Sequence, residues 1–152
     1  EHRASRFGQR PKFIVITGSA DTLQGNVAKA LEEKLFRDGH YVYYLSIANL
    51  LHGLFDAEST RDGDEREENI RRLGELARIF TDAGMIFITD ISRLDAYEID
   101  ILKALNQPNE ILVIDLDEYA RSGDAAGGGS EMLLKRIEKL LYQQDILWDY
   151  SI

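Results

Sequence analysis

A loop that could hold a phosphate group follows the first apolar run of the chain. The run, residues 13–17, is rich in β-branched residues, and a helical pattern of apolar residues starts near Val27. In a strand–loop–helix connection of this kind, consecutive backbone N–H groups can point at an anion. The residues that could form a degenerate phosphate loop here are Gly18, Ser19, Ala20, Asp21, Thr22, Leu23, Gln24 and Gly25.

Three positions of this loop differ from what a triphosphate requires. A lysine normally binds the outer phosphates, and a serine or threonine binds magnesium. Gln24 stands where the lysine is expected, Gly25 stands where the hydroxyl is expected, and Asp21 replaces a glycine that lets the backbone approach. Two unit charges about 4 Å apart interact by about 4 kcal/mol at an effective dielectric constant of about 20. The loss of the lysine cation and the gain of the Asp21 carboxylate would therefore weaken triphosphate binding by several kcal/mol. The loop by itself is therefore more typical of an ordinary turn, with triphosphate binding as the alternative.

Carboxylates follow two other expected strands. Asp90 comes after the third strand and would add to the repulsion of a phosphate if it faces the same crevice. Asp115 and Asp117 come at the end of the fourth strand, but two carboxylates make a weak case for a metal. His52 lies in an apolar turn and is more typical of a packed or surface histidine. We therefore expect neither a catalytic residue nor a metal site.

Apolar runs alternate with helical patterns along the chain, which predicts a parallel sheet covered by helices on both faces. In such folds ligands bind beyond the carboxyl ends of the strands, where the residues above would lie. The expected strands are residues 13–18, 41–45, 85–89 and 110–116, and the expected helices are residues 27–37, 65–82, 95–105 and 131–143. Gly39 and Gly84 are expected to end the first two helices.

The composition indicates one domain that is not a nucleic-acid or membrane protein. The chain has 152 residues, 18 Lys+Arg against 27 Asp+Glu, a net charge of −9 and no cysteine. The acidic balance argues against phosphate-backbone binding, and no apolar run is long enough to span a bilayer. We expect a linker or arm over residues 1–12, a domain over residues 13–152, and a cytoplasmic location.

One stretch carries a family resemblance. Arg66 is followed three residues later by Asn69-Ile70-Arg71-Arg72, in a helix that ends in Asp82-Ala83-Gly84 before a strand. This stretch resembles adenylylsulfate kinase, and the weaker matches are Ala30 to Leu35, His52-Gly53-Leu54 and the arm Arg6 to Pro11. The resemblance covers residues 6–92 and implies a three-layer, P-loop kinase-like α/β fold with a mainly parallel sheet. It also implies ATP- and magnesium-dependent phosphorylation of adenylylsulfate at its ribose 3′-hydroxyl.

The resemblance implies substrate-binding roles for Arg66, Asn69 and Ser92, although the first two could simply form a solvated helix start. Other family features are absent. Ser46-Ile47-Ala48 replaces the segment with the expected catalytic aspartate, and Leu51 replaces an arginine. Residues 90–93 replace a Phe-Ile-Ser-Pro motif, and the glycine loop of residues 122–130 replaces a long basic lid.

These departures predict a catalytically inactive relative with a regulatory or architectural role in sulfate activation. It would bind adenylylsulfate or a related adenosine nucleotide weakly, with ATP and magnesium as cofactors only if it were active. The arm resembles the lead-in found behind a sulfate adenylyltransferase, so a fused sulfate adenylyltransferase or GTPase-like domain is the expected partner. An active kinase with displaced catalytic groups, or a ligand-free interaction module that forms a homodimer, are the alternatives.

Overall fold

The sheet at the centre of the protein is entirely parallel. The computed structural model describes residues 9–19, 23–46, 62–121 and 129–147. The described strands pair in the order β2-β3-β1-β4, as the alternation of elements predicts. Their bounds are β1 Lys12–Gly18, β2 Val42–Ser46, β3 Ile86–Ser92 and β4 Leu112–Asp115.

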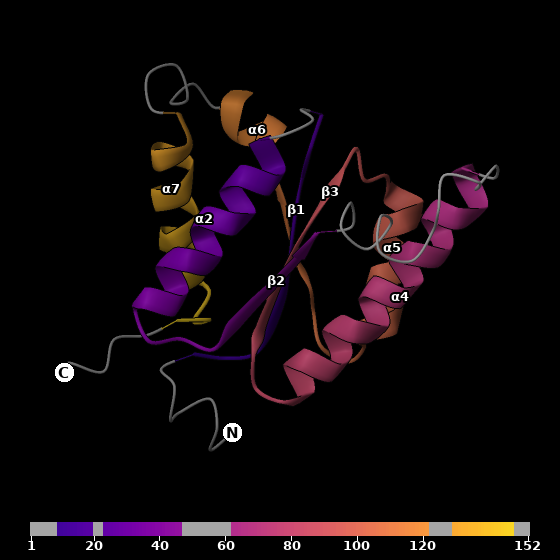
Figure 1. Ribbon diagram of the computed structural model, residues 1–152, viewed down its shortest axis with the longest axis horizontal. Coiled ribbons are helices and arrows are strands. Elements are labelled where there is room, and N and C mark those ends of the chain that lie inside the picture. Colours follow the sequence, from indigo (N-terminus) through magenta and orange to yellow (C-terminus); the bar gives the residue numbers. More distant parts are fainter. Residues whose placement is uncertain (1–8, 20–22, 47–61, 122–128, 148–152) are drawn as a thin grey trace.

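Helices cover both faces of this sheet and make the three layers of the fold. Helices α2 and α7 lie on one face, and helices α4 and α5 lie on the other (Figure 1). The bounds are α2 Leu23–Arg37, α4 Asp62–Asp82, α5 Ala96–Asn106, α6 Leu116–Arg121 and α7 Gly129–Gln143. None of the described helices is both long and apolar enough to cross a membrane.

The alternation of side chains in β1 divides the core between the two faces. Ile14 and Ile16 pack with α2 and α7, whereas Phe13 and Val15 pack with α4 and α5. Successive side chains of a strand point to opposite faces, so this run of fully or almost fully buried residues supplies both cores. Burial of each such side chain contributes about 1.5–3 kcal/mol. This strand therefore positions Gly18 and Ser19 at its carboxyl end.

Helix ends follow the expected local signals. Gly39 and Gly84 adopt φ values of 94° and 92°, which glycine adopts without a steric penalty, and both follow a helix as predicted. Asp95 caps α5, because its side chain accepts the backbone N–H of Glu98 while Glu98 accepts that of Asp95.

Several element bounds differ from the prediction. Helix α2 begins at Leu23 rather than near Val27, and β3 continues to Ser92 because it pairs with β1 as far as Gly18. The expected strand over residues 110–116 is shorter: β4 covers Leu112–Asp115, and the chain then turns into α6, which was not predicted. The side chain of Asp115 accepts the N–H of Asp117 at 2.9 Å and thereby favours this early turn.

The described part of the predicted arm is packed against the domain. Gln9 is fully buried, and its amide donates to the carbonyls of Tyr41 and Gly84 at 2.8 and 3.2 Å. Gln9 also bridges Leu147 near the other end of the described chain. Residues 1–8 of the arm lie outside the described residues, as do residues 148–152.

Candidate functional site

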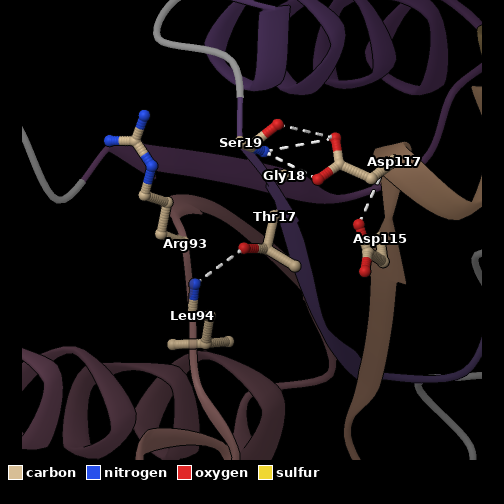
Figure 2. Close-up of a pocket in the computed structure, with 7 residues that line it drawn as sticks. All are labelled: Thr17, Gly18, Ser19, Arg93, Leu94, Asp115 and Asp117. Carbon is tan, nitrogen blue, oxygen red and sulfur yellow. Dashed lines mark hydrogen bonds between the residues drawn. The ribbon is translucent and has the colours of Figure 1, made fainter.

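A pocket opens at the carboxyl edge of the sheet, where a parallel α/β fold is expected to bind its ligand. It has a volume of about 140 Å³ and lies between the ends of β1, β3 and β4. Figure 2 shows the lining residues, which are Thr17, Gly18, Ser19, Arg93, Leu94, Asp115 and Asp117. The structure therefore brings the first residues of the suspected phosphate loop next to two carboxylates.

The carboxylate of Asp117 binds the first part of that loop. It accepts the backbone N–H of Ser19 at 3.1 and 3.2 Å and the hydroxyl of Ser19 at 3.2 Å (Figure 2). Ala20, Asp21 and Thr22, which belong to the predicted loop, lie outside the described residues. Among the loop residues that the structure describes, Ser19 thus already has an anion on its backbone N–H.

Gln24 occupies the position expected for a phosphate-binding lysine, and it is buried. Its side-chain amide donates to the carbonyl of Gly18 at 3.1 Å and so joins the start of α2 to the end of β1. An amide carries no charge, so it cannot supply the cation that outer phosphates require. Leu23, just before it, is half-buried and packs against the core formed with α2 and α7.

Asp90 lies beside the start of α2. A Cβ atom added at Gly25 would lie 3.4 Å from Oδ2 of Asp90 and 3.6 Å from the hydroxyl of Tyr44. That hydroxyl donates to Oδ1 of Asp90 at 2.6 Å. Burial raises the pKa of Tyr44 far above that of a free tyrosine, and the hydrogen bond to Asp90 raises it further. The phenol therefore remains a donor to a carboxylate at neutral pH.

Arg66 and Ser92 are brought together, as the substrate-site prediction requires. Nη2 of Arg66 donates to the carbonyl of Ser92 at 2.9 Å. The same guanidinium forms a two-point ion pair with the carboxylate of Glu98, with Nε 2.6 Å from Oε2 and Nη2 3.1 Å from Oε1. Because Glu98 is buried and also forms the cap of α5, it holds Arg66 at the edge of the sheet. A substrate role for Arg66 and Ser92 remains a prediction.

Asn69 lies one turn along α4 from Arg66 and is fully buried. Its Nδ2 donates to the carbonyl of Glu65 at 2.8 Å, within the same helix. Its Oδ1 has no hydrogen-bond partner among the described residues. An acceptor without a partner is compatible with the predicted contact between Asn69 and a substrate. That contact stays a prediction.

Arg93 is the cation that lines the described pocket, and its backbone is unusual. It adopts φ 54°, in the left-handed region that residues other than glycine rarely occupy. In Figure 2 its guanidinium is turned away from Asp115 and Asp117. The family resemblance places a proline at this position, and proline cannot adopt a positive φ. The backbone after β3 must therefore differ from that of the motif.

Among the residues that the structure describes, those at the loop do not fit a magnesium–triphosphate. The lysine position holds a neutral amide, the hydroxyl position holds Gly25, and a carboxylate lies on Ser19. Within the described ranges no group of three or more His, Cys, Asp or Glu residues could hold a metal ion. Leu51, His52, Ile47 and Ala48 lie outside those ranges, as does most of the glycine loop.

Two contacts of the site were missed by the sequence analysis. The capping box of Asp95 and Glu98 could have been found from its spacing, whereas the ion pair of Glu98 with Arg66 joins residues 32 positions apart. The contact between Asp117 and Ser19 joins residues 98 positions apart, so no local spacing reveals it.

Comparisons with known proteins agree on one family. The sequence model of the family described as Adenylylsulphate kinase matches residues 10–108. An adenylyl-sulfate kinase of Geotalea uraniireducens is 37% identical over 116 residues, 74% of this chain and 55% of that protein. The bifunctional enzyme CysN/CysC of Rhodopirellula baltica is 36% identical over 91 residues, 60% of this chain and 14% of that protein. This chain therefore spans about half the length of the adenylyl-sulfate kinase it matches.

Solved structures show the same fold. Mycobacterium tuberculosis APS kinase CysC in complex with AMPPNP and APS has a TM-score of 0.70 at 19% identity, covering 88% of this chain and 99% of that one. A hexameric APS kinase from Thiobacillus denitrificans has a TM-score of 0.68 at 18% identity, covering 97% of this chain and 32% of that one. The P-loop kinase fold predicted from the sequence is thus confirmed.

Proposed function

The chain belongs to the adenylylsulfate kinase family, and from that premise we propose that it keeps the family fold but does not transfer phosphate. Its role is regulatory or architectural within sulfate activation, and it binds an adenosine nucleotide only weakly. The observation that carries this proposal is the buried, neutral Gln24 at the position of the phosphate-binding lysine.

The electrostatics of the crevice support the loss of phosphoryl transfer. Kinases stabilise the transferred phosphoryl group by positioning and by neutralising its charge. Here the described pocket is lined by the carboxylates of Asp115 and Asp117, with Arg93 as the lining cation, and Asp90 lies beside the start of α2. Arg66, the other guanidinium at this edge, is paired with Glu98. A polyphosphate would therefore meet net negative charge.

The fused partner is part of the same proposal. The bifunctional relative matches this chain over a small part of its own length, and the packed residue Gln9 connects the domain to the upstream arm. We propose that a sulfate adenylyltransferase or GTPase-like domain is attached or associated, in the cytoplasm. The alternative of a ligand-free interaction module draws support from Tyr41 and Tyr43, which are 52% and 42% exposed at or beside the edge strand β2.

A coupled assay tests the proposal. Phosphate transfer from ATP to adenylylsulfate would be measured with magnesium for the chain and for the adenylyl-sulfate kinase of Geotalea uraniireducens as a positive control. We expect no turnover above background. Turnover that is abolished by Asp90→Ala and retained in Asp100→Ala, an exposed change on α5, would instead establish an active kinase with displaced groups.

The melting temperature distinguishes an inactive domain that binds a nucleotide weakly from an interaction module that binds none. A ligand that binds only the folded state raises the melting temperature by mass action. We expect adenylylsulfate to raise it modestly at millimolar concentration, because Arg66 and Ser92 remain together at the pocket edge. A melting temperature unmoved by any adenosine nucleotide would favour the ligand-free interaction module.

A further inference from the structure

We propose that Asp117 is a specificity-determining residue that acts as a built-in anion and keeps phosphate groups off the loop after β1. The inference rests on the proposed function and deepens it, because it names the side chain that occupies the anion position. It concerns residues 18 and 19 of the loop and the carboxylate opposite them.

The contact has the form of an anion in a binding loop. A phosphate loop presents backbone N–H groups, supported by hydroxyls, to negatively charged oxygens. Ser19 presents one N–H group and one hydroxyl to Asp117, and both oxygens of the carboxylate lie within 3.2 Å of the backbone nitrogen. These hydrogen bonds are exposed and 3.1–3.2 Å long, and an incoming oxyanion must displace the carboxylate from both donors of Ser19.

Asp117 is held in place by its own element. Its backbone N–H donates to Oδ1 of Asp115 at 2.9 Å, which fixes the first turn of α6 directly after β4. A Cβ added at Gly18 would lie 3.4 Å from Oδ1 of Asp117, so the carboxylate closes over the end of β1. The strand, the short helix and the loop together present the carboxylate to Ser19.

The carboxylate of Asp117 accepts hydrogen bonds from Ser19 and does not form an ion pair with a described basic side chain. Across the described part of the chain, no lysine or arginine forms an ion pair with Asp117. Arg93, on the other side of the pocket, points away from it (Figure 2). A second anion near Ser19 would therefore meet an unneutralised carboxylate. The pocket consequently selects against ligands that place a phosphate at this end of the loop.

The test compares two variants that remove the same charge from neighbouring residues. Asp117→Ala removes the carboxylate that binds Ser19, whereas Glu118→Ala removes an exposed carboxylate one residue further along α6. Inorganic pyrophosphate, with magnesium chelated, would be titrated into each protein by calorimetry. We expect Asp117→Ala to bind pyrophosphate at least tenfold more tightly than the wild type, and Glu118→Ala to change the affinity by less than twofold.

Equal changes of pyrophosphate affinity in the two variants, or no change in either, would overturn the inference.

Circular dichroism checks that each variant is folded. If Asp117→Ala fails to fold, Asp117→Asn keeps the side-chain shape, and the same comparison then uses Glu118→Gln. The backbone amide resonance of Ser19 should shift on pyrophosphate addition only in the position-117 variant. Kinase turnover by the wild type would reject the proposed function, whereas a missing effect at position 117 rejects this inference alone.

Discussion

Several polar side chains at the carboxyl end of the sheet are already hydrogen-bonded to other groups of the protein. Gln24 has a neutral amide at the position expected for a lysine, and its Nε2 donates a hydrogen bond to the carbonyl of Gly18. Asp90 is hydrogen-bonded to a tyrosine and lies against the start of α2, and Asp117 lies on Ser19. Each contact satisfies a polar group of the chain, and under the proposed function each disfavours the binding of a polyphosphate. Under the proposed function, the loss of phosphoryl transfer is distributed over several short-range contacts.

The raised pKa of Tyr44 predicts how the free energy of unfolding depends on pH. Because the pKa of its phenol is raised in the folded state, the unfolded chain ionises first as the pH passes about 10. The folded state then holds the extra proton, so the free energy of unfolding falls as the pH rises from about 10 toward the higher pKa of the folded state. Tyr44→Phe should lose about 1 kcal/mol at pH 7 through the missing hydrogen bond, yet decline less steeply at alkaline pH.

Urea unfolding at several pH values measures this difference. Tyr142→Phe, at an exposed position of α7, is the control and should follow the wild-type slope. If the alkaline decline of Tyr44→Phe matched that of the wild type, the assignment of the raised pKa to the native environment of Tyr44 would be wrong.

Local sequence patterns predicted the long elements well, because their signals are local. Gly39 and Gly84 follow helices as expected, and the apolar runs form parallel strands. Helix α6 was missed because Leu116 continues an apolar run, and such a run does not distinguish a strand end from a short helix. The contact of α6 with the loop depends on how β1 and β4 pair, which is a long-range property.

Gly74 tests how closely two helices pack on one face of the sheet. A Cβ added there would lie 2.8 Å from Cδ1 of Leu105 and 3.2 Å from Cδ2 of Leu102, both on α5. Gly74→Leu should therefore lower the free energy of unfolding by about 1–3 kcal/mol, because the helices must separate or repack. Glu75→Leu, at the next and exposed position of α4, should change it by less than about 0.5 kcal/mol.

Urea denaturation of both variants gives the comparison. A Gly74→Leu protein as stable as the wild type would show that α4 and α5 are not packed as closely as described.

At the scale of the whole molecule, the family fold is intact while the phosphate site has changed. Both cores, the parallel sheet and the pairing of Arg66 with the end of β3 are in place. The net charge of −9 adds a long-range field that disfavours polyanions, although salt screens it over about 8–10 Å. A family fold whose crevice contains carboxylates and lacks the phosphate-binding lysine would suit the proposed role within a larger assembly, and the bifunctional relative provides a precedent for such a context.

Calorimetric titration of the chain with ATP and magnesium tests the central claim most directly. At physiological salt we predict no saturable binding up to about 1 mM ATP, which corresponds to a binding free energy weaker than about −4 kcal/mol. Saturable micromolar binding that requires magnesium would contradict the account, because it would mean that this crevice still holds a triphosphate without the lysine that Gln24 has replaced.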